Sequence, residues 1–209
     1  YGGSTTVNAN ATALAANNSA FGTNGVVTVT SGGRIQMSNG ITVGRALVLN
    51  GDGLSYSGSL QNVSGNNTWS GNITNNSGAR INSDTGTLTI SGNITNAANQ
   101  SLYLGGAGNT TVNGTVTGSL NNAGWNGALY KDGSGTLVLS ANNTGLTGTV
   151  RLKGGTISVT NGNSLGTGAL ELGSGGTLAT LLINSNTTVV NRLEVSDSAT
   201  NAVINVAAG

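Results

Sequence analysis

Apolar and polar residues alternate with a period of two along most of the chain, in runs of a few residues. Clusters of Gly, Asn, Ser and Asp separate the runs. This pattern is typical of short strands joined by turns, so we expect an all-β protein. One exception is Ala11–Ala16, whose Ala and Leu content favours a turn of helix. We expect strands in Val26–Thr30, Leu47–Leu49, Thr87–Ile90, Leu102–Leu104, Thr136–Leu139, Val150–Lys153, Ile157–Val159, Leu170–Leu172 and Leu193–Val195.

The strand-like runs also recur at a fixed spacing. The sequence SGNITN occurs at Ser70–Asn75 and again at Ser91–Asn96, and NGTVT at Asn113–Thr117 continues the series. A short period with strand-sized units predicts a solenoid, in which each coil stacks on the one before it. Dividing the chain by this period gives a parallel β-helix of about ten coils of roughly 20–22 residues.

Successive coils of such a fold place like side chains in inward columns. Gly and Asn suit the corners, where the backbone needs positive φ, and stacked Asn side chains can form hydrogen bonds along the axis. The absence of Pro agrees with ladders that continue on both sides. The repeats predict one core column made of Ile73, Ile94, Val116, Leu137, Ile157 and Leu178.

A longer repeat overlies the coil spacing, because residues 18–35 (NSAFGTNGVVTVTSGGRI) resemble residues 163–178 (NSLGTGALELGSGGTL). We interpret residues 1–209 as one continuous solenoid segment. It begins with Tyr rather than Met, as expected for a processed product or an excised piece. Neither end shows a capping sequence, so we expect coils to dock there, by covalent continuation of the chain or between copies. The candidate docking residues are Tyr1, Thr5 and Val7 at one end and Val203, Ile204 and Val206 at the other.

Composition narrows the possible chemistry. Charged residues make up 6% of the chain, and Cys and His are absent. Disulfides, thiolate or imidazole metal sites and catalysis by Cys or His therefore lack their residues, and we expect no cofactor. The net charge is +1 with seven scattered Lys and Arg, which is not the pattern of a nucleic-acid-binding protein. No apolar run is long enough to span a membrane.

The segment Lys131–Leu178 carries a family resemblance (KDGSGTLVLSANNTGLTGTVRLKGGTISVTNGNSLGTGALELGSGGTL). It resembles the autotransporter-associated β-strand repeats of bacterial surface passenger domains. That family runs as a GAGTL strand, an NxYxGxT turn, a GGTL strand and an ALGTG turn, and Leu146 stands where it usually has Tyr or Thr. The resemblance implies a right-handed parallel β-helix outside the bacterial cell, associated with the outer membrane. It is specific for architecture and export rather than for function.

We therefore expect a non-catalytic structural rod, as a surface stalk or an end-to-end fibre. One alternative is an adhesin that binds glycans through Trp69 or Trp125, which would otherwise form a cap or an outer packing patch. The other is a β-helical polysaccharide lyase or hydrolase, which needs three carboxylates and an Arg in one groove, whereas the acidic residues are expected to scatter. Arg151 and Glu171, one coil apart, should form a weak surface ion pair, and Asp132 should lie in a turn.

Overall fold

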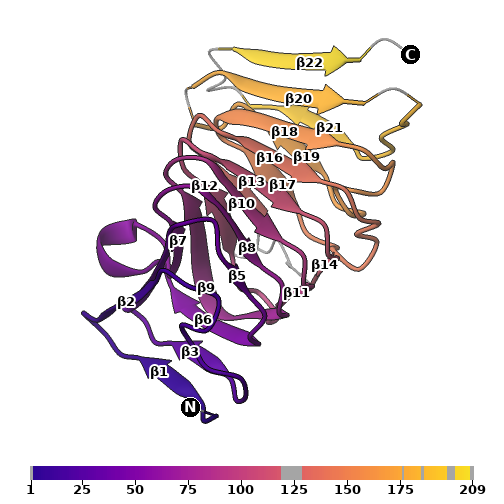
Figure 1. The fold of residues 1–209 in the computed structure, drawn as a ribbon. Helices are drawn as coiled ribbons and strands as arrows, with labels where there is room; N and C mark the ends of the chain where they lie inside the picture. The colour runs from indigo at the N-terminus through magenta and orange to yellow at the C-terminus, as the bar shows by residue number, and fades with distance from the viewer. Residues whose placement is uncertain (1, 119–128, 176, 185, 197–200, 208–209) are drawn as a thin grey trace.

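The computed structural model describes residues 2–118, 129–175, 177–184, 186–196 and 201–207. It is an all-β solenoid of about eight turns, with parallel strands stacked from the N-terminal end at the bottom of Figure 1 to the C-terminal end at the top. All nine predicted strand regions contain a strand. The elements are β1 (Thr5–Val7), β2 (Thr12–Ala15), β3 (Val27–Val29), β4 (Arg34–Met37), β5 (Thr42–Val43), β6 (Leu47–Gly51), the 3-10 turn η1 (Leu54–Tyr56), β7 (Leu60–Asn62), β8 (Asn66–Trp69), β9 (Ile73–Ser83), β10 (Thr87–Ile90), β11 (Ile94–Asn96), β12 (Leu102–Gly105), β13 (Asn109–Val112), β14 (Val116–Thr117), β15 (Leu129–Lys131), β16 (Thr136–Leu139), β17 (Val150–Leu152), β18 (Gly155–Val159), β19 (Leu170–Leu172), β20 (Ala179–Ile183), β21 (Leu193–Val195) and β22 (Ala202–Val206).

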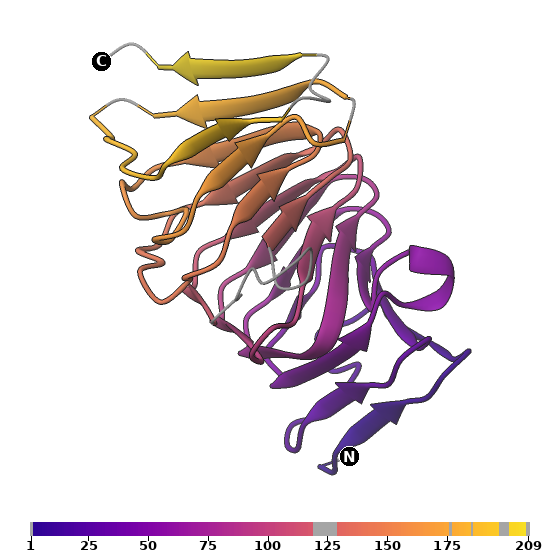
Figure 2. The same cartoon turned by 180° about the vertical axis from the view of Figure 1, so that it is seen from behind.

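These strands form three stacked ladders, which Figure 2 shows from behind. The first ladder contains β1, β3, β6, the start of β9, β11 and β14. The second contains β2, β4, β7, the end of β9, β12, β15, β17, β19 and β21. The third contains β5, β8, β10, β13, β16, β18, β20 and β22. Because the first ladder ends at β14, the last coils have two strands each and a loop on the third side.

Several coils are longer than the sequence repeat, which is why there are about eight turns and not ten. In the third ladder Val43 pairs with Trp69, and Val112 pairs with Leu139, so each of these coils exceeds the repeat by several positions. The first of these coils includes the loop around η1, and the second includes residues 119–128. Dividing the chain length by the sequence repeat counts these inserted residues as additional coils.

The first half of the predicted core column is confirmed. Ile94 pairs directly with Ile73 on one side and with Val116 on the other, and all three side chains are buried. They belong to the first ladder, in which β11 and β14 follow the start of β9. The SGNITN repeat therefore corresponds to one full coil, as the spacing predicted.

The second half of that column lies in a different ladder and is wrong at its last member. Leu137 pairs with Ile157 in the third ladder, and both are fully buried. The next residue in this column is Leu181, whereas Leu178 is 55% exposed. The coil from Ile157 to Leu181 is longer than the sequence repeat. Counting one repeat from Ile157 therefore ends at Leu178, a few residues before the residue that occupies the core position.

Asparagines continue one inward column of the first ladder. Asn75 follows Leu49 in register, Asn96 follows Asn75, and both asparagines are buried. The Nδ2 of Asn75 donates to Oδ1 of Asn96 at 3.0 Å, and Nδ2 of Asn96 donates to the carbonyl of Thr117 at 3.0 Å. Asparagine side chains therefore do form hydrogen bonds along the axis, as expected from the composition.

The expected turn of helix at Ala11–Ala16 is wrong. Thr12–Ala15 forms β2, which pairs in parallel with β4. Ala15 points inward and is fully buried, while Leu14 is 65% exposed. The helix preference of Ala is small, and pairing along the whole strand outweighs it.

The two copies of the longer repeat share a turn. The amide of Gly22 donates to the carbonyl of Ser19, and that of Gly166 to the carbonyl of Asn163, both at 3.0 Å. Both glycines have positive φ, 67° and 72°. The strand after the first turn, β3, belongs to the first ladder, however, and the strand after the second, β19, to the second ladder. The two copies therefore lie on different sides of the solenoid.

Candidate functional site

A column of charged and aromatic side chains covers the outer surface of the second ladder. Its residues are in strand-to-strand register, each one coil above the last, because outward positions of parallel strands stack as inward ones do. We call this set the outer column; it consists of Arg80, Tyr103, Tyr130, Arg151, Glu171 and Glu194.

Two stacked tyrosines form the centre of the outer column. The rings of Tyr103 and Tyr130 are 4.5 Å apart and 7° from parallel. The Arg80 guanidinium lies 5.9 Å from the Tyr103 ring centre, and the Arg151 guanidinium 5.7 Å from that of Tyr130. Lys153 Nζ is 5.6 Å from the same ring. Cations at these distances are attracted to the faces of aromatic rings.

Arg80 forms a bidentate ion pair with Asp132, two coils further along the axis. Its Nη1 and Nη2 lie 2.9 and 2.7 Å from the two carboxylate oxygens. Gly105 lies in the coil between them, in register with Asn82, and a Cβ there would overlap both charged groups. Asp132 was expected only to form a turn, and its pairing with Arg80 is a contact that the coil spacing did not reveal.

Arg151 and Glu171 form the predicted pair, but in a less exposed setting than expected. Arg151 Nε lies 2.7 Å from Oε2 of Glu171, and the two side chains are 9% and 14% exposed. Arg151 Nη1 also donates to the Tyr130 hydroxyl at 3.1 Å. Burial opposes the charged form of Arg151, but its bonds to Tyr130 and Glu171 outweigh this and raise its pKa.

Beside the outer column, Asp52, Tyr56, Arg80 and Tyr103 line a cleft of about 170 Å³. Burial raises the pKa of Asp52, and the charge of Arg80 partly offsets this. Burial also raises the pKa of Tyr103, as do the neighbouring Tyr130, Asp52 and Asp132, against the opposing effect of Arg80. The expectation that the acidic residues scatter is therefore wrong for Asp52 and Asp132, which both lie in the electrostatic environment of Arg80 and Tyr103.

Lys131 occupies an inward position in the second ladder, between Leu104 and Leu152 in register. Its Nζ donates to the carbonyls of Asp132, Gly133 and Gly154 at 2.7, 3.1 and 3.3 Å. Burial lowers its pKa to about 8 from the usual 10.5. Asp132 acts in the opposite direction, and Arg80 adds to the lowering. A buried amine that binds only carbonyl groups is part of the core.

The predicted glycan contact at Trp69 is wrong. Trp69 is fully buried, on the inward column of the third ladder, and Nε1 donates to the carbonyl of Arg45 at 2.8 Å. Its ring packs 6.0 Å from that of Phe21. Trp69 is therefore a core residue and not a cap or an outer patch, since strand alternation turns it inward with Asn67. Trp125 lies outside the described residues.

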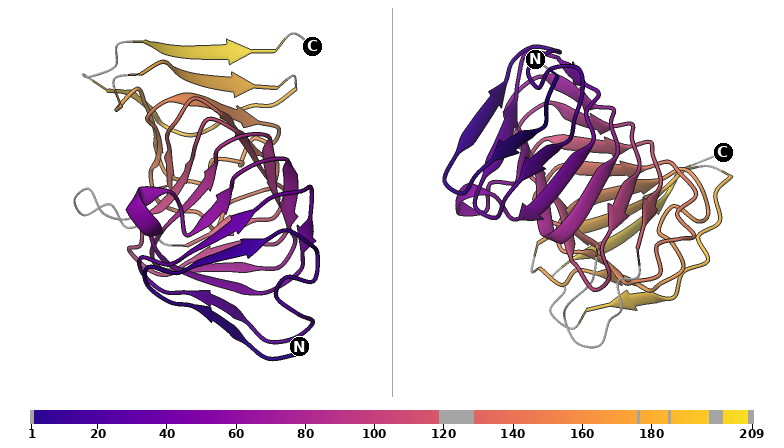
Figure 3. Two further views of the ribbon diagram at one scale, coloured as in Figure 1. Left: turned by 60° about the vertical axis from the view of Figure 1, so that its left-hand side comes forward. Right: turned by 90° about the horizontal axis from the view of Figure 1, so that it is seen from below.

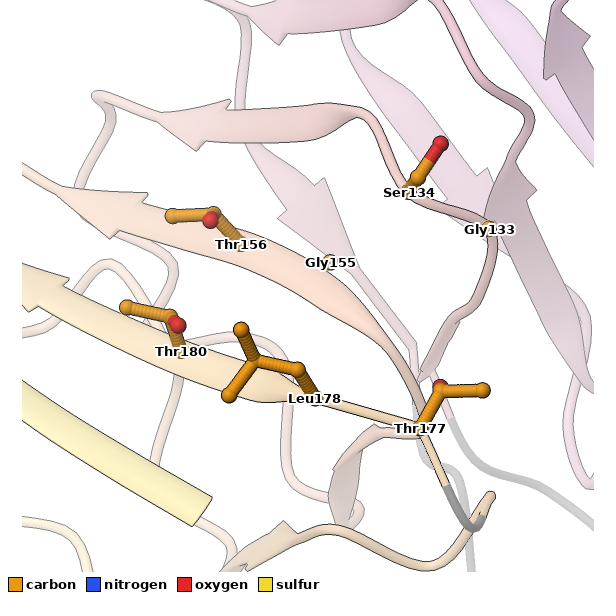
Figure 4. A pocket seen from close by; sticks show the side chains of 7 residues that line it. All are labelled: Gly133, Ser134, Gly155, Thr156, Thr177, Leu178 and Thr180. Carbon is orange, nitrogen blue, oxygen red and sulfur yellow. The ribbon is translucent and has the colours of Figure 1, made fainter. Parts of the chain in front are cut away.

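Figure 4 shows a second hollow, on the outer side of the third ladder. It has a volume of about 350 Å³ and presents hydroxyl groups and one exposed leucine. Among the described residues that line it there is no ionisable side chain, so it offers less chemistry than the cleft beside the outer column. Its lining residues are Gly133, Ser134, Gly155, Thr156, Thr177, Leu178 and Thr180.

The predicted docking residues differ in accessibility between the two ends. Val7 is 4% exposed, and Thr5 is half-buried. Val203, Ile204 and Val206 are 42%, 48% and 63% exposed. Ile204 and Val206 lie on inward columns, whereas Val203 follows Thr180 on an outward column. Tyr1 lies outside the described residues.

Comparison with protein-family models, with curated proteins and with solved structures gave no match to this chain. Within the described ranges, no group of three or more acidic, Cys or His side chains could hold a metal ion. No helix in the same part of the chain is long and apolar enough to cross a membrane. A proposal about function therefore depends on the solenoid and its surface.

Sequence reasoning missed Asp52, Tyr56, Arg80 and Tyr103 as a group. A signal for part of it exists, because Arg80, Tyr103 and Tyr130 follow one another along the sequence at steps close to one coil. Aromatic and basic residues are scarce in this chain, so their recurrence at coil spacing indicates a shared outer position. The approach of Asp52 depends on the loop conformation, which no repeat predicts.

Proposed function

We propose that this chain is a segment of a non-catalytic structural rod on a bacterial surface, wound as a right-handed β-solenoid. Parallel strands of one sheet are almost always connected with a right-handed crossover, which supports the hand. The resemblance of Lys131–Leu178 to autotransporter repeats supports export to the cell surface. The absence of Cys suits a chain that crosses the periplasm unfolded. The rod is a stalk within a longer passenger or an end-to-end fibre.

The observation that carries this proposal is the exposed apolar end of the last coil. Leu137, Ile157, Leu181 and Ile204 form one inward column, in which the first three are at most 2% exposed and Ile204 is 48% exposed. Each member before the last is covered by the next coil. A further coil would bury Ile204 in the same way, with the usual gain from removing apolar surface from water.

The occupant that we assign to this end is the N-terminal edge of a second copy. Among the described residues, β1 and β2 each pair with one strand, β3 and β4, so a parallel strand of another copy, such as β21 or β22, can be added on their outer side. Free strand edges pair readily with further strands. The N-terminal edge offers backbone groups, and the C-terminal end offers the apolar columns.

Sedimentation velocity and electron microscopy of the purified chain over a range of concentrations test this proposal. We expect linear end-to-end assemblies, and we expect Ile204→Lys with Val206→Lys to abolish them. Leu178→Lys is the matched control, because Leu178 is also apolar and 55% exposed but lines the lateral hollow of Figure 4 and not an end of the solenoid. A chain that stays monomeric at every concentration, or assemblies that tolerate the C-terminal lysines, would overturn the end-to-end docking of copies.

A further inference from the structure

The loop between β6 and β7 is longer than the solenoid requires. The coil that leads from Val27 to its partner Leu47 is short, whereas the next coil, from Leu47 to its partner Ile73, contains additional residues. The additional residues form η1, which projects from the side of the solenoid in Figure 3. Since shorter connections suffice elsewhere, this projection has no evident role in stacking the coils.

The backbone of this loop holds Tyr56 out in the solvent in a strained conformation. Ser55 and Tyr56 have φ of 54° and 60°, a region that bulky residues rarely adopt. The loop is nevertheless fixed, because Arg34 Nη1 donates to Oγ of Ser57 at 3.1 Å, and Ser57 Oγ donates to the carbonyl of Leu54 at 2.8 Å. Tyr56 is 77% exposed. Backbone strain of this kind is often found at ligand-binding sites. The positive φ of the exposed Tyr56, which the bonds of Ser57 maintain, therefore indicates a ligand-binding role for this side chain.

The cleft under this ring offers one carboxylate as an acceptor. None of the described residues donates a hydrogen bond to the side chain of Asp52, which is half-buried and lines the cleft together with Tyr56 and Tyr103. Arg80 lines the same cleft, but its two terminal nitrogens are bound to Asp132. Tyr103 is held in place by its stacking on Tyr130. The cleft thus combines a free acceptor with aromatic surface and a cation that already has a partner.

We propose that this cleft is a subsite for neutral carbohydrate, in which a sugar ring stacks on Tyr56 and adjacent hydroxyls donate to Asp52. A pyranose has an apolar face that suits an aromatic ring and a rim of hydroxyl donors that suits a carboxylate. An acidic sugar is disfavoured, because Asp52 would repel it and Arg80 is neutralised by Asp132. This inference is independent of the rod proposal, since it concerns the lateral surface and not the ends.

Saturation-transfer NMR with cellohexaose, maltohexaose and mannohexaose, and with oligogalacturonate as the acidic counterpart, tests the subsite. We expect binding of at least one neutral hexaose and none of oligogalacturonate. Tyr56→Ala and Asp52→Asn should each weaken binding by about tenfold or more, and Tyr56→Phe should retain it because the ring remains. Glu194→Gln is the matched control, because Glu194 is a partly exposed carboxylate in β21, several coils away from the cleft.

A second variant separates binding from folding. Tyr56→Gly relieves the positive φ, so its melting temperature should equal or exceed that of the wild type, while its binding is lost. Failure of every neutral hexaose to bind overturns the proposal. Unchanged binding in Tyr56→Ala or Asp52→Asn, or a preference for oligogalacturonate, overturns it as well. None of these results bears on end-to-end assembly, so the two proposals fail separately.

Discussion

The two ends of the solenoid have equivalent strand pairing but different interiors. At the N-terminal end the inward residues Val7 and Ala15 are 4% and 0% exposed. At the C-terminal end Leu193, Ile204 and Val206, which also continue inward columns, are 42%, 48% and 63% exposed. Among the described residues, each terminal strand pairs with one neighbouring strand. Backbone pairing alone therefore does not decide whether the end of a solenoid is closed.

Side-chain size and the course of the first loop account for the difference. In the first coil the third ladder has no strand, and Phe21 in the loop between β2 and β3 is buried there, 6.0 Å from the ring of Trp69. Small inward residues such as Ala15 leave little surface to cover. The C-terminal coil ends instead in branched aliphatic residues. The N-terminal coil therefore presents backbone edges with little apolar side-chain surface, whereas the C-terminal coil presents apolar side chains to solvent.

The largest effect should come from removing the aromatic packing between Phe21 and Trp69 in the N-terminal half. Trp69→Ala leaves a cavity in a fully buried site and should lower the free energy of unfolding by about 3–5 kcal/mol. Ile204→Ala, at the C-terminal end, should cost less than about 1 kcal/mol, because half of this side chain already faces water. Urea denaturation of monomeric protein measures both. Similar losses in the two variants would contradict the difference in burial between Trp69 and Ile204.

The interior between the two ends also contains buried asparagines, and their contribution can be tested at Asn96. Asn96→Ala removes the hydrogen bonds to Asn75 and Thr117 inside a buried column and should cost about 1–3 kcal/mol. Asn93→Ala is the matched control. Asn93 accepts from the amide of Thr115 but is exposed, so water replaces the lost bond. Thermal unfolding of the two variants should therefore separate them clearly, with Asn96→Ala the less stable.

The sequence predicts the solenoid well because its strands depend on local alternation and on a repeat. Ile73, Ile94 and Val116 were placed correctly since SGNITN and NGTVT mark consecutive coils. Leu178 was misplaced because extra residues lengthen its coil, and a repeat gives no measure of insertions.

The candidate site is harder to predict because its parts lie in different coils and in an irregular loop. The cleft is formed by Asp52 and Tyr56 from the loop and by Arg80 and Tyr103 from two neighbouring strands of the second ladder. Only the last two follow the coil spacing. Trp69 illustrates the opposite error. A rare tryptophan was interpreted as a surface residue for glycan stacking, whereas the alternation of β8 places its side chain in the core.

Lys131, in an inward column midway between the ends, should make stability depend on pH. Its pKa is lowered from 10.5 to about 8, so between these values the unfolded chain keeps a proton that the folded chain has lost. The free energy of unfolding should therefore rise with pH in this window, by about 1–2 kcal/mol after allowance for solvent screening. Above pH 10 the raised pKa of Tyr103 acts in the opposite direction, so urea denaturation between pH 8 and pH 10 is the appropriate measurement.

Lys131→Met provides the control for this pH dependence. Methionine fills the same inward position between Leu104 and Leu152 with an unbranched side chain of similar length, but it has no titrating group. Its stability should not rise between pH 8 and pH 10. A slope equal to that of the wild type would mean that another group causes the dependence.

The smallest effect is expected at Gly105, whose missing side chain makes room for the ion pair between Arg80 and Asp132. A Cβ at this position would overlap both charged groups, which are the ends of flexible side chains and can move aside. Gly105→Ala should therefore separate the pair and cost less than about 1 kcal/mol, since the pair is partly exposed. Gly3→Ala is the matched control, because a Cβ there meets no other atom within 4 Å.

A double-mutant cycle decides whether Gly105 acts through that ion pair. Asp132→Asn should destabilise the wild type measurably but should have little further effect in the Gly105→Ala background, because the pair is already broken there. Additive losses would show that Ala at position 105 acts on the backbone instead. Since Arg80 lines the carbohydrate cleft, its release should also let it reach an acidic sugar. Weak binding of oligogalacturonate by Gly105→Ala, absent from the wild type, would show that Asp132 normally keeps this cleft selective for neutral ligands.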